Sequence, residues 1–353
     1  MRGAFLPGGR RVELRDVAAP VPAAGQVLVR PRASTICGSD VRAIYREHLG
    51  SGPEAYQDVI AGHEPCGDVV AVGDDVRRIR VGQRVVVYHI SGCGQCEDCR
   101  RGYQISCTSD RRAAYGWQRD GGHADLLLAE ERDLLVLPDF LSYVDGACVA
   151  CGGGTAYEAL CRADVSGRDA VLVTGLGPVG LMTGLLAKAL GAVRVVGTDP
   201  VAGRREVALG IGAVDDALDG SDEDAVVQAL GPGAEVAVDC SGSTGGRASA
   251  VRHARRWGRV VLVGEGGRLD VDASEQLLHR AVTVIGSWVT STVRMAELLD
   301  VLDRHRVHLD VVVTEVFDLA DVAEAYAVAD AGRTGKVGVV QGPWEGRPGS
   351  GHV

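Results

Sequence analysis

Three glycines in the middle of the chain constrain its fold more than any other feature. The run that holds them reads Gly175, Leu176, Gly177, Pro178, Val179 and Gly180. An apolar segment precedes the run, and a Leu- and Ala-rich segment follows it. The first glycine permits a tight turn, the second lets a pyrophosphate approach the backbone, and the third lets helix and strand pack closely. The pyrophosphate then binds the N–H groups at the helix N-terminus, so the run predicts a dinucleotide site.

The segments around these glycines alternate between strand and helix. We expect strands at Ala170–Val173, Val193–Thr198, Val236–Cys240, Arg259–Val263 and Val282–Ile285. We expect helices at Val179–Leu190, Gly203–Gly210 and Thr244–Trp257. Nearly all-apolar strands alternating with helices are typical of a parallel sheet covered on both faces, the doubly wound α/β class.

Asp199 favours NAD as the dinucleotide. It ends the second expected strand, beyond Gly180. An acidic side chain there accepts hydrogen bonds from the adenosine ribose hydroxyls and repels a 2′-phosphate. Arg204 and Arg205 offer such a phosphate positive charge, which keeps NADP as the less favoured alternative. The glycine run itself has another interpretation, a glycine-rich turn in an ordinary α/β domain.

The two ends of the chain have a different pattern of expected strands and helices. Val-rich strands bounded by turn residues are expected at Gln26–Arg32, Val69–Val72 and Arg84–Tyr88. After residue 287 we expect a helix at Thr292–Arg304, a strand at Val311–Glu315, a helix at Leu319–Ala329 and a strand at Lys336–Gln341. This last segment either completes the parallel sheet or rejoins the N-terminal part. The Gly- and Pro-rich tail Gly342–Val353 is expected to be loose.

Four of the ten cysteines lie close together in the sequence. They are Cys93, Cys96, Cys99 and Cys107. Zinc prefers tetrahedral sulfur, and four thiolates leave no open position, so the spacing predicts a structural zinc site. An iron–sulfur cluster is the alternative, because four cysteines also bind iron. Zinc is favoured because the rest of the chain supplies hydride chemistry and no electron relay.

A second group of residues suggests an open metal site. Cys37-Gly-Ser39-Asp40 and Gly62-His63-Glu64 both lie in the strand-rich N-terminal part. Cysteine and histidine suit zinc, and three protein ligands plus a free position make a catalytic site. The third ligand has to come from elsewhere, and Cys151 lies just before the dinucleotide-binding segment. Taken singly, each residue also has an ordinary structural interpretation: Cys37 as a small core residue, and His63 as a histidine in a turn.

Length and composition exclude several classes of protein. The chain has 353 residues and a net charge of −10, which favours two domains and argues against nucleic acid as a partner. Hydrophobic residues make up 46% and charged residues 24%, as in globular proteins. No apolar run is long enough for a membrane span, and Met1–Arg10 lacks the core of a signal peptide. We therefore expect a cytoplasmic protein with no membrane partner.

Taken together, these motifs resemble those of the zinc-dependent medium-chain dehydrogenase/reductase family, which includes alcohol, sorbitol and threonine dehydrogenases. The motifs that carry the resemblance are Cys37–Asp40, Gly62–Glu64, the four-cysteine segment, Cys151–Tyr157, Thr174–Gly180 and Thr334–Val337. The resemblance implies a strand-rich, GroES-like catalytic domain over 1–151 and 287–353, with a structural zinc lobe at 91–109. A Rossmann domain at 152–286 would be inserted between its two parts and would bind NAD.

The resemblance also implies roles for single residues and two zinc ions per chain. Cys37, His63 and Cys151 resemble the ligands of the catalytic zinc, and Cys148 competes with Cys151 for the third place. Glu64 resembles a carboxylate that approaches the metal during ligand exchange. Asp40 resembles the acid that orients the ring of a ligating histidine. Ser39 resembles the hydroxyl that takes the proton of an alcohol.

The expected proton relay departs from the family pattern after Ser39. Family members often carry a histidine a few residues after this motif, whereas this chain has Arg42 and reaches a histidine only at His48. Either His48 takes the role, or the proton leaves through the ribose and water. Tyr45, His48, Tyr56, Tyr115, Trp117 and Trp288 are candidate pocket residues that suit loop or interface positions equally well. His123 receives no role.

These features predict an NAD-dependent dehydrogenase that converts a secondary alcohol, either a polyol, a sugar-like alcohol or an aminocyclitol, to the ketone. The alternatives are a primary or aromatic alcohol dehydrogenase and an NADPH-dependent aldehyde reductase. A non-catalytic scaffold and a zinc-free quinone reductase are disfavoured, because no ligand or glycine is missing. The family implies a homodimer or homotetramer, and Val282–Trp288 could pair across an interface.

Overall fold

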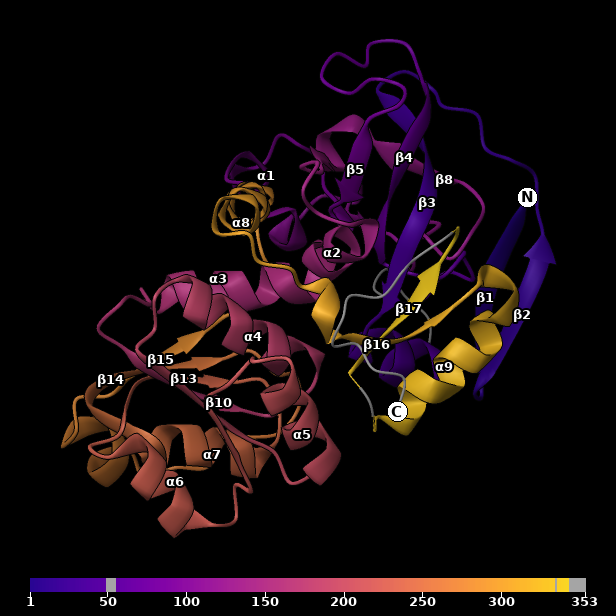
Figure 1. The fold of residues 1–353 in the computed structure, drawn as a ribbon. Helices are drawn as coiled ribbons and strands as arrows, with labels where there is room; N and C mark the ends of the chain where they lie inside the picture. The colour runs from indigo at the N-terminus through magenta and orange to yellow at the C-terminus, as the bar shows by residue number, and fades with distance from the viewer. Residues whose placement is uncertain (49–54, 334, 343–353) are drawn as a thin grey trace. The chain divides into compact units, whose positions relative to one another are not determined.

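The computed structural model describes residues 1–48, 55–333 and 335–342 (Figure 1). Thr334 and the tail residues 343–353, both discussed above, lie outside these described residues. The chain divides into two compact units. The first unit comprises Met1–Gly154 and Thr290–Val353, and the second comprises Thr155–Val289. The catalytic and cofactor-binding roles expected for these two parts remain predictions.

The first unit is built on a sheet of seven strands. Its order is β16-β17-β3-β4-β5-β9, with β8 paired to one end of β3. The strands are β3 (Gln26–Ile36), β4 (Glu64–Val72), β5 (Arg84–Val87), β8 (Leu127–Glu130), β9 (Leu134–Val136), β16 (Val313–Phe317) and β17 (Lys336–Val340). Because β17 pairs with β3, the C-terminal segment rejoins the N-terminal part and does not extend the parallel sheet.

Short elements surround this sheet. Two strand pairs are β1 (Arg2–Gly8) with β2 (Arg11–Asp16) and β6 (Ile90–Ser91) with β7 (Ala113–Ala114). The α-helices are α1 (Glu97–Arg100), α2 (Tyr143–Cys148), α8 (Thr292–His305) and α9 (Val322–Ala331). The π-helical segments are η1 (Asp40–Tyr45) and η4 (Val149–Gly153), and the 3₁₀ turns are η2 (Gln104–Ser106), η3 (Glu131–Asp133), η6 (Asp310–Val312) and η7 (Leu319–Asp321). The strand expected from Val311 and the helix expected from Leu319 therefore both begin with a 3₁₀ turn.

The second unit has the predicted doubly wound parallel sheet. Its strand order is β12-β11-β10-β13-β14-β15, and all neighbours are parallel. The strands are β10 (Ala170–Thr174), β11 (Arg194–Thr198), β12 (Asp216–Leu218), β13 (Ala234–Asp239), β14 (Ala254–Leu262) and β15 (Thr283–Gly286). The helices are α3 (Gly154–Arg162), α4 (Pro178–Ala189), α5 (Ala202–Gly210), α6 (Glu223–Leu230), α7 (Thr244–His253) and the π-helical η5 (Ala273–Leu278). Figure 1 shows α4 and α7 on opposite faces of this sheet.

The helix expected over Thr244–Trp257 is too long. In the structure it ends at His253, and β14 begins at Ala254, which pairs with Ala234 of β13. The pairing then shifts register, and Trp257 takes a left-handed backbone conformation with φ of 63° while its side chain is exposed. An irregular strand start thus replaces the last expected helical turn. The short elements β12 and α6 were not predicted.

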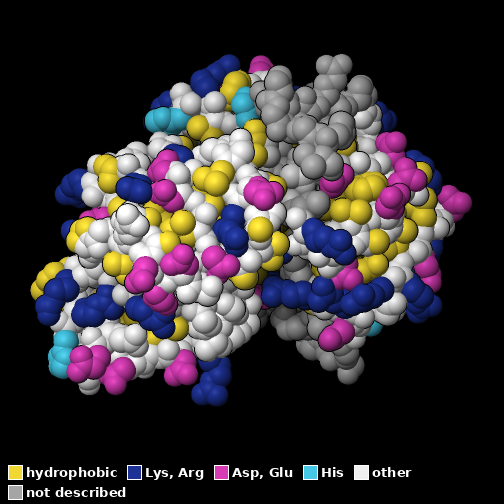
Figure 2. Space-filling view, turned by 60° about the horizontal axis from the view of Figure 1, so that its bottom comes forward, with side chains coloured by type: hydrophobic (Ala, Val, Ile, Leu, Met, Phe, Trp, Pro, Cys, Tyr) yellow, Lys and Arg dark blue, Asp and Glu magenta, His cyan; other side chains and the backbone are white. Residues whose placement is uncertain are grey.

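Among the described residues, no helix is both long and apolar enough to cross a membrane. On the face drawn in Figure 2, acidic and basic side chains are interspersed, with apolar side chains between them.

A buried carboxylate ties the C-terminal return of the first unit to α2. Asp145 forms a capping box with Ser142 at the start of α2. Its Oδ1 accepts hydrogen bonds from the backbone N–H groups of Leu309 and Asp310, at 2.7 and 2.8 Å. Its Oδ2 lies 2.7 Å from Nδ1 of His308. One side chain therefore satisfies donors from two segments that lie far apart in the sequence.

We expect Asp145→Ala to lower the free energy of unfolding by about 3 kcal/mol, because buried N–H groups lose their acceptor. Guanidinium unfolding would measure the loss. The control is Asp125→Ala, which removes a carboxylate whose ion pair with Arg2 is partly exposed. It should cost less than about 1 kcal/mol. Equal losses in the two variants would contradict a special role for Asp145.

Candidate metal centres and dinucleotide-binding edge

Four side chains from three separate segments meet at one point of the first unit. One ligand atom from each of Cys37, His63, Glu64 and Cys151 lies within 4.8 Å of the others. The strand pairing explains this convergence. Cys37 follows the end of β3, and Glu64 begins β4 opposite Thr35 of β3. Cys151 lies in the π-helical segment η4, which continues directly from α2.

The donor atoms suit a zinc ion. The two thiols share a hydrogen bond, which lowers the pKa of Cys37 well below its usual value and raises that of Cys151 well above it. The shared hydrogen bond therefore shifts one of the two sulfurs toward the thiolate form that metal binding requires. Cys148 is buried and is not one of the four clustered residues, and its burial raises the pKa of its thiol. The geometry thus favours Cys151 as the third candidate ligand.

Asp40 orients the His63 ring. Its Oδ1 lies 2.7 Å from Nδ1 of His63, and its Oδ2 accepts a hydrogen bond from the backbone N–H of Cys37 at 3.0 Å. Asp40 is fully buried. Although burial opposes it, the negative charge of Asp40 holds the pKa of His63 well above its usual value in the metal-free chain. With Nδ1 engaged, Nε2 of His63 is left as the atom for a metal.

Glu64 carries a buried carboxylate with one committed and one free oxygen. Its Oε2 accepts a hydrogen bond from Thr35 Oγ1 at 2.5 Å and lies 2.7 Å from Nζ of Lys336. Within the described ranges, Oε1 is buried without a hydrogen-bond partner. A free carboxylate oxygen beside two sulfurs and an imidazole suits a group that can approach a metal.

Sequence reasoning assigned no role to Lys336. Only 2% of its surface is exposed, and Nζ also donates to the carbonyl of Ile36 at 3.3 Å. Although burial opposes it, the negative charge of Glu64 raises the pKa of Lys336. The sequence contains a hint of this role, because the chain has only two lysines and Lys336 belongs to the closing motif. Its partner became visible only once β17 was paired with β3.

His89 is a second residue that sequence reasoning missed. Its ring centroid lies 5.2 Å from that of His63, and its Nδ1 lies 2.9 Å from the carbonyl oxygen of Ala150. Burial lowers the pKa of His89 to about 4, so the ring is neutral at physiological pH. Because the carbonyl can only accept, Nδ1 must carry the hydrogen, which leaves Nε2 as an acceptor.

The other expected residues are not members of this four-residue cluster. Ser39 is half-buried and immediately precedes η1. Arg42 is exposed, and its Nε donates to the carbonyl of Gly38 at 3.3 Å. His48 is exposed, with its ring edge-on to Tyr56 at 5.0 Å.

The candidate pocket aromatics have structural contacts. Tyr115 is fully buried and donates its hydroxyl hydrogen to Asp133 at 2.9 Å, so it is a core residue. Tyr45 is buried and packs against Tyr326. Trp117 is half-buried against the same hydrophobic cluster as Tyr45. Trp288, in the second unit, donates to Glu265 at 3.0 Å.

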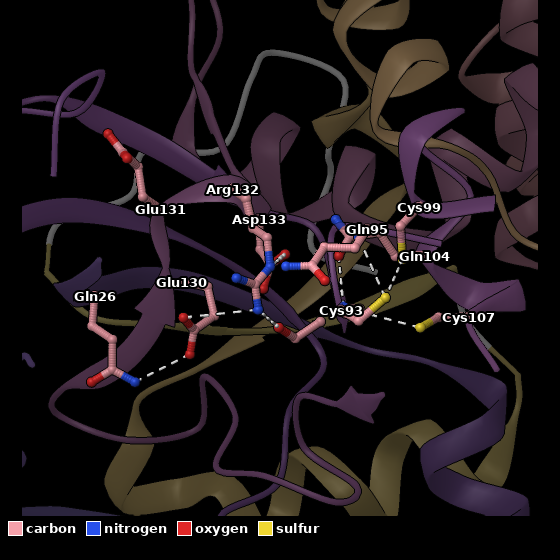
Figure 3. Close-up of polar contacts among 12 residues, drawn as sticks. Gln26, Cys93, Gln95, Cys99, Gln104, Cys107, Glu130, Glu131, Arg132 and Asp133 are labelled. Atoms are coloured by element: carbon pink, nitrogen blue, oxygen red, sulfur yellow. Dashed lines mark hydrogen bonds and ion pairs between the residues drawn. The ribbon is translucent and has the colours of Figure 1, made fainter. Parts of the chain in front are cut away.

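The four-cysteine lobe is arranged for metal binding. Ligand atoms of Cys93, Cys96, Cys99 and Cys107 all lie within 4.8 Å of one another. Figure 3 shows Cys93 pointing toward Cys99 and Cys107, with Gln95 beside it. Backbone N–H groups of Gln95 and Cys96 donate to Cys93 Sγ and lower its pKa to about 6. A stabilised thiolate among three further sulfurs fits a closed zinc site.

The glycine run of the second unit forms the expected strand–turn–helix. Gly175 has φ of 91°, and a Cβ on it would lie 2.7 Å from the backbone of Ser241. A Cβ on Gly180 would lie 1.9 Å from the carbonyl oxygen of Gly175, whereas one on Gly177 would face open space. Pro178 occupies the first turn of α4, followed by Val179. These contacts match the three separate demands that a dinucleotide-binding turn makes on its glycines.

Asp199 lies at the end of β11 against this turn. Its Oδ2 accepts a hydrogen bond from the backbone N–H of Leu176 at 2.9 Å, and its Oδ1 accepts one from Val201 at 2.9 Å. Arg204 Nη1 lies 3.6 Å from Oδ2. The carboxylate at the end of β11 is therefore paired with an arginine.

Comparison with known proteins gives the family. Residues 23–139 match the family model described as the alcohol dehydrogenase GroES-like domain, and residues 178–304 match that of the zinc-binding dehydrogenases. The chain is 47% identical over 344 residues to an uncharacterized zinc-type alcohol dehydrogenase-like protein, YphC, of Escherichia coli K12, covering 96% of this chain and 98% of the relative. The chain belongs to the zinc-dependent medium-chain dehydrogenase/reductase family. It is thus an oxidoreductase of the alcohol dehydrogenase type.

Two further relatives are more distant. L-Threonine 3-dehydrogenase of Pyrococcus horikoshii is 30% identical over 343 residues, covering 93% of this chain and 95% of the relative. The crystal structure of a zinc-binding dehydrogenase of Sinorhizobium meliloti 1021 bound to NADP superposes with a TM-score of 0.85 at 26% identity. That match covers 96% of this chain and 99% of the other. Together they support the predicted fold, a GroES-like domain with a Rossmann-like parallel sheet.

We expect Lys336→Met to lower the free energy of unfolding of the metal-free protein by about 3–5 kcal/mol, because it leaves Glu64 as an unpaired buried charge. Chemical unfolding in the presence of a chelator measures this loss. The matched control is Lys188→Met, which removes the only other lysine, whose pair with Asp215 is partly exposed. It should cost less than about 1 kcal/mol. Similar losses for both lysines would show that the buried pair has no special importance.

Proposed function

We propose that the protein is a zinc-dependent dehydrogenase that transfers hydride between a secondary alcohol and NAD, giving the ketone. The observation that carries the proposal is the convergence of Cys37, His63, Glu64 and Cys151, whose ligand atoms lie within 4.8 Å of one another. A second zinc is assigned to the four-cysteine lobe, where it has a structural role. The glycine run and Asp199 of the second unit provide the dinucleotide site.

The residues of the first unit have separate roles in holding the metal and orienting its ligands. Cys37, His63 and Cys151 hold the catalytic zinc, and Asp40 fixes the ring of His63 through Nδ1. When bound, zinc acts as a Lewis acid that makes the alcohol more acidic, and the nicotinamide accepts hydride. Glu64, held by Lys336 and Thr35 through Oε2, keeps Oε1 available during exchange of substrate and water.

Ser39 takes the proton of the alcohol, and its further path differs from the family pattern. Family members often carry a histidine a few residues after this motif, and this chain has none between Ser39 and His48. His48 is the nearest histidine along the chain, and its ring packs on Tyr56. The proton therefore leaves through His48 or through ribose and water.

The polar character of the site favours a polyol, a sugar-like alcohol or an aminocyclitol. Neutral His89, next to the ring of His63, has Nε2 available to accept a hydrogen bond. A second hydroxyl or an amino group of the substrate would supply the donor. Simple aliphatic alcohols have no such group, so they would leave this acceptor unpaired.

NADP use is the one competing proposal with a specific observation behind it. Arg204 lies 3.6 Å from Asp199, and a solved relative is bound to NADP. An NADPH-dependent aldehyde reductase would use the same two units. NAD is preferred because the carboxylate of Asp199, and not the guanidinium, lies directly against the N–H of Leu176.

We also propose that the protein forms a homodimer or a homotetramer. β15 is the edge strand of the parallel sheet, so its outer backbone groups are available for pairing with a second copy. The ten cysteines are free thiols in the structure, which suits the reducing cytoplasm.

The test of the function is a substrate screen that follows NADH absorbance. Polyols, sugars, aminocyclitols and L-threonine would be compared with primary and aromatic alcohols, each with NAD and with NADP. Turnover of secondary alcohols with NAD supports the proposal. Turnover confined to aldehydes with NADPH would replace it with the reductase.

Metal content separates the two zinc sites. We expect about two zinc ions per wild-type chain and about one in Cys37→Ala, with turnover lost and NADH binding retained. Cys148→Ala is the matched control, because Cys148 lies three residues from Cys151 outside the cluster, and it should keep two zinc ions. Elemental analysis and fluorescence titration make the measurements. Wild-type turnover in Cys37→Ala would refute the catalytic zinc site.

Asp199→Asn tests the choice of cofactor. Removing the negative charge should lower the KM for NADP by roughly tenfold, since one like-charge contact near a surface costs about 1–4 kcal/mol. The KM for NAD should rise, because a ribose acceptor is weakened. Asp215→Asn, which removes a carboxylate paired with Lys188, is the control and should change neither value. Unchanged cofactor preference in Asp199→Asn would show that another residue discriminates.

A further inference from the structure

Three loops of the second unit are pressed together at the carboxyl ends of β10, β13 and β14. A Cβ on Gly175, after β10, would lie 2.7 Å from Cα of Ser241 in the loop after β13. A Cβ on Gly264, after β14, would lie 2.2 Å from the backbone nitrogen of Gly242. A Cβ on Gly267 would lie 2.6 Å from the carbonyl oxygen of Gly242. The backbones therefore touch where no side chain fits, and something else has to hold them in place.

Asp239, the last residue of β13, is the acceptor shared by two of these loops. It is fully buried. Its Oδ1 accepts hydrogen bonds from Thr174 Oγ1 at the end of β10, at 2.9 Å, and from the hydroxyl and backbone N–H of Ser241, at 2.6 and 3.1 Å. Its Oδ2 accepts one from the backbone N–H of Gly242 at 3.2 Å. One carboxylate thus joins the end of β10 to the loop after β13.

Arg247, on α7, extends this connection to the third loop. Its Nε lies 3.5 Å from Asp239 Oδ2. Its Nη1 donates to the carbonyl of Gly267 at 3.1 Å, and its Nη2 donates to that of Gly264 at 2.6 Å. The two terminal nitrogens of the planar guanidinium donate to both carbonyls at once. Nε pairs with Asp239 by charge only, because it has no hydrogen-bond partner among the described residues. The two side chains therefore hold all three loops.

The position of these loops in the sheet indicates what Asp239 and Arg247 do. In the strand order β12-β11-β10-β13-β14-β15, the chain reverses direction of growth between β10 and β13. Ligands of open parallel sheets bind outside the carboxyl ends of the strands at such a switch point. Asp239 and Arg247 direct their polar atoms at the protein itself, so they can shape the site without contacting its ligand.

We propose that Asp239 and Arg247 are a positioning pair that fixes the three loops in their dinucleotide-binding arrangement before the dinucleotide arrives. The inference rests on the proposed use of NAD. Loops ordered in advance spare the dinucleotide the entropic cost of ordering them, which raises its affinity. A merely structural role would lower stability and leave the affinity of the folded protein unchanged.

The test uses full-length Arg247→Met, which keeps the apolar stem, and Arg247→Lys, which keeps the charge but loses the fork. The control is Arg252→Met, because Arg252 lies on the same helix and pairs with Glu223 away from these loops. Amide hydrogen exchange at Gly242 and Gly264–Gly267 is measured without dinucleotide. Kd values for NADH and NADPH are measured by fluorescence titration, and thermal unfolding checks that each variant is folded.

We expect faster exchange at these glycines and a Kd for NADH raised on the order of tenfold in Arg247→Met, as when the outer partner of a binding group is removed. Arg247→Lys should fold like the wild type yet show both effects, so the inference stays testable if the Met variant unfolds. Arg252→Met should show neither effect.

Two results would overturn the inference. One is an unchanged Kd in folded Arg247 variants, and the other is a raised Kd without faster loop exchange, which would indicate direct contact with the dinucleotide. If the wild type bound neither NADH nor NADPH, the proposed cofactor use would fail. The exchange data would then still show whether the pair orders the loops, so the two failures are distinguishable.

Discussion

The buried ion pair between Glu64 and Lys336 joins two distant parts of the chain at the candidate metal centre. The two residues lie on β4 and β17, which are separated by most of the chain and share β3 as their neighbour in the sheet. A carboxylate without exposure needs a cation or a set of donors, and here it has a lysine and a threonine hydroxyl. Burial raises the pKa of Glu64, and the C-terminal segment contributes the positive charge of Lys336, which opposes that shift.

The same device recurs at the other junctions of the molecule. Asp145 joins α2 to the returning C-terminal segment. Asp239 joins the end of β10 to the loop after β13 in the parallel sheet. In each case a buried carboxylate accepts hydrogen bonds from two segments. The donors to Asp145 include backbone N–H groups of both segments, whereas Asp239 binds backbone N–H groups after β13 and the hydroxyl of Thr174. Such an arrangement satisfies several buried donors at once, and it loses all of them if the carboxylate is removed. Regular strands and helices form the framework of each unit, whereas these few acidic side chains hold the loops and the returning segment against it.

Features that depend on neighbours in the sequence could be predicted, and those that depend on strand pairing could not. The turn at Gly175 and the clustering of Cys93 with Cys96 follow from short spacings, so sequence reasoning reached them. Lys336 and His89 were missed because their partners, Glu64 and Ala150, become neighbours only after the sheet forms. Cys151 was a candidate because it lies just before the dinucleotide-binding segment, and the resemblance to a family favoured it over Cys148.

Errors at element boundaries have the same origin. The helical pattern of Thr244–Trp257 continues beyond the point where Ala254 pairs with Ala234, and sheet pairing overrides the local preference. Asp239 and Arg247 were likewise invisible, because an acid at a strand end and an arginine on a helix are ordinary until the loops between them are in place. Residues that bind a metal or nucleotide are thus easier to recognise than residues that hold them. The former follow the chemistry of the ligand, whereas the latter follow the packing of this particular chain.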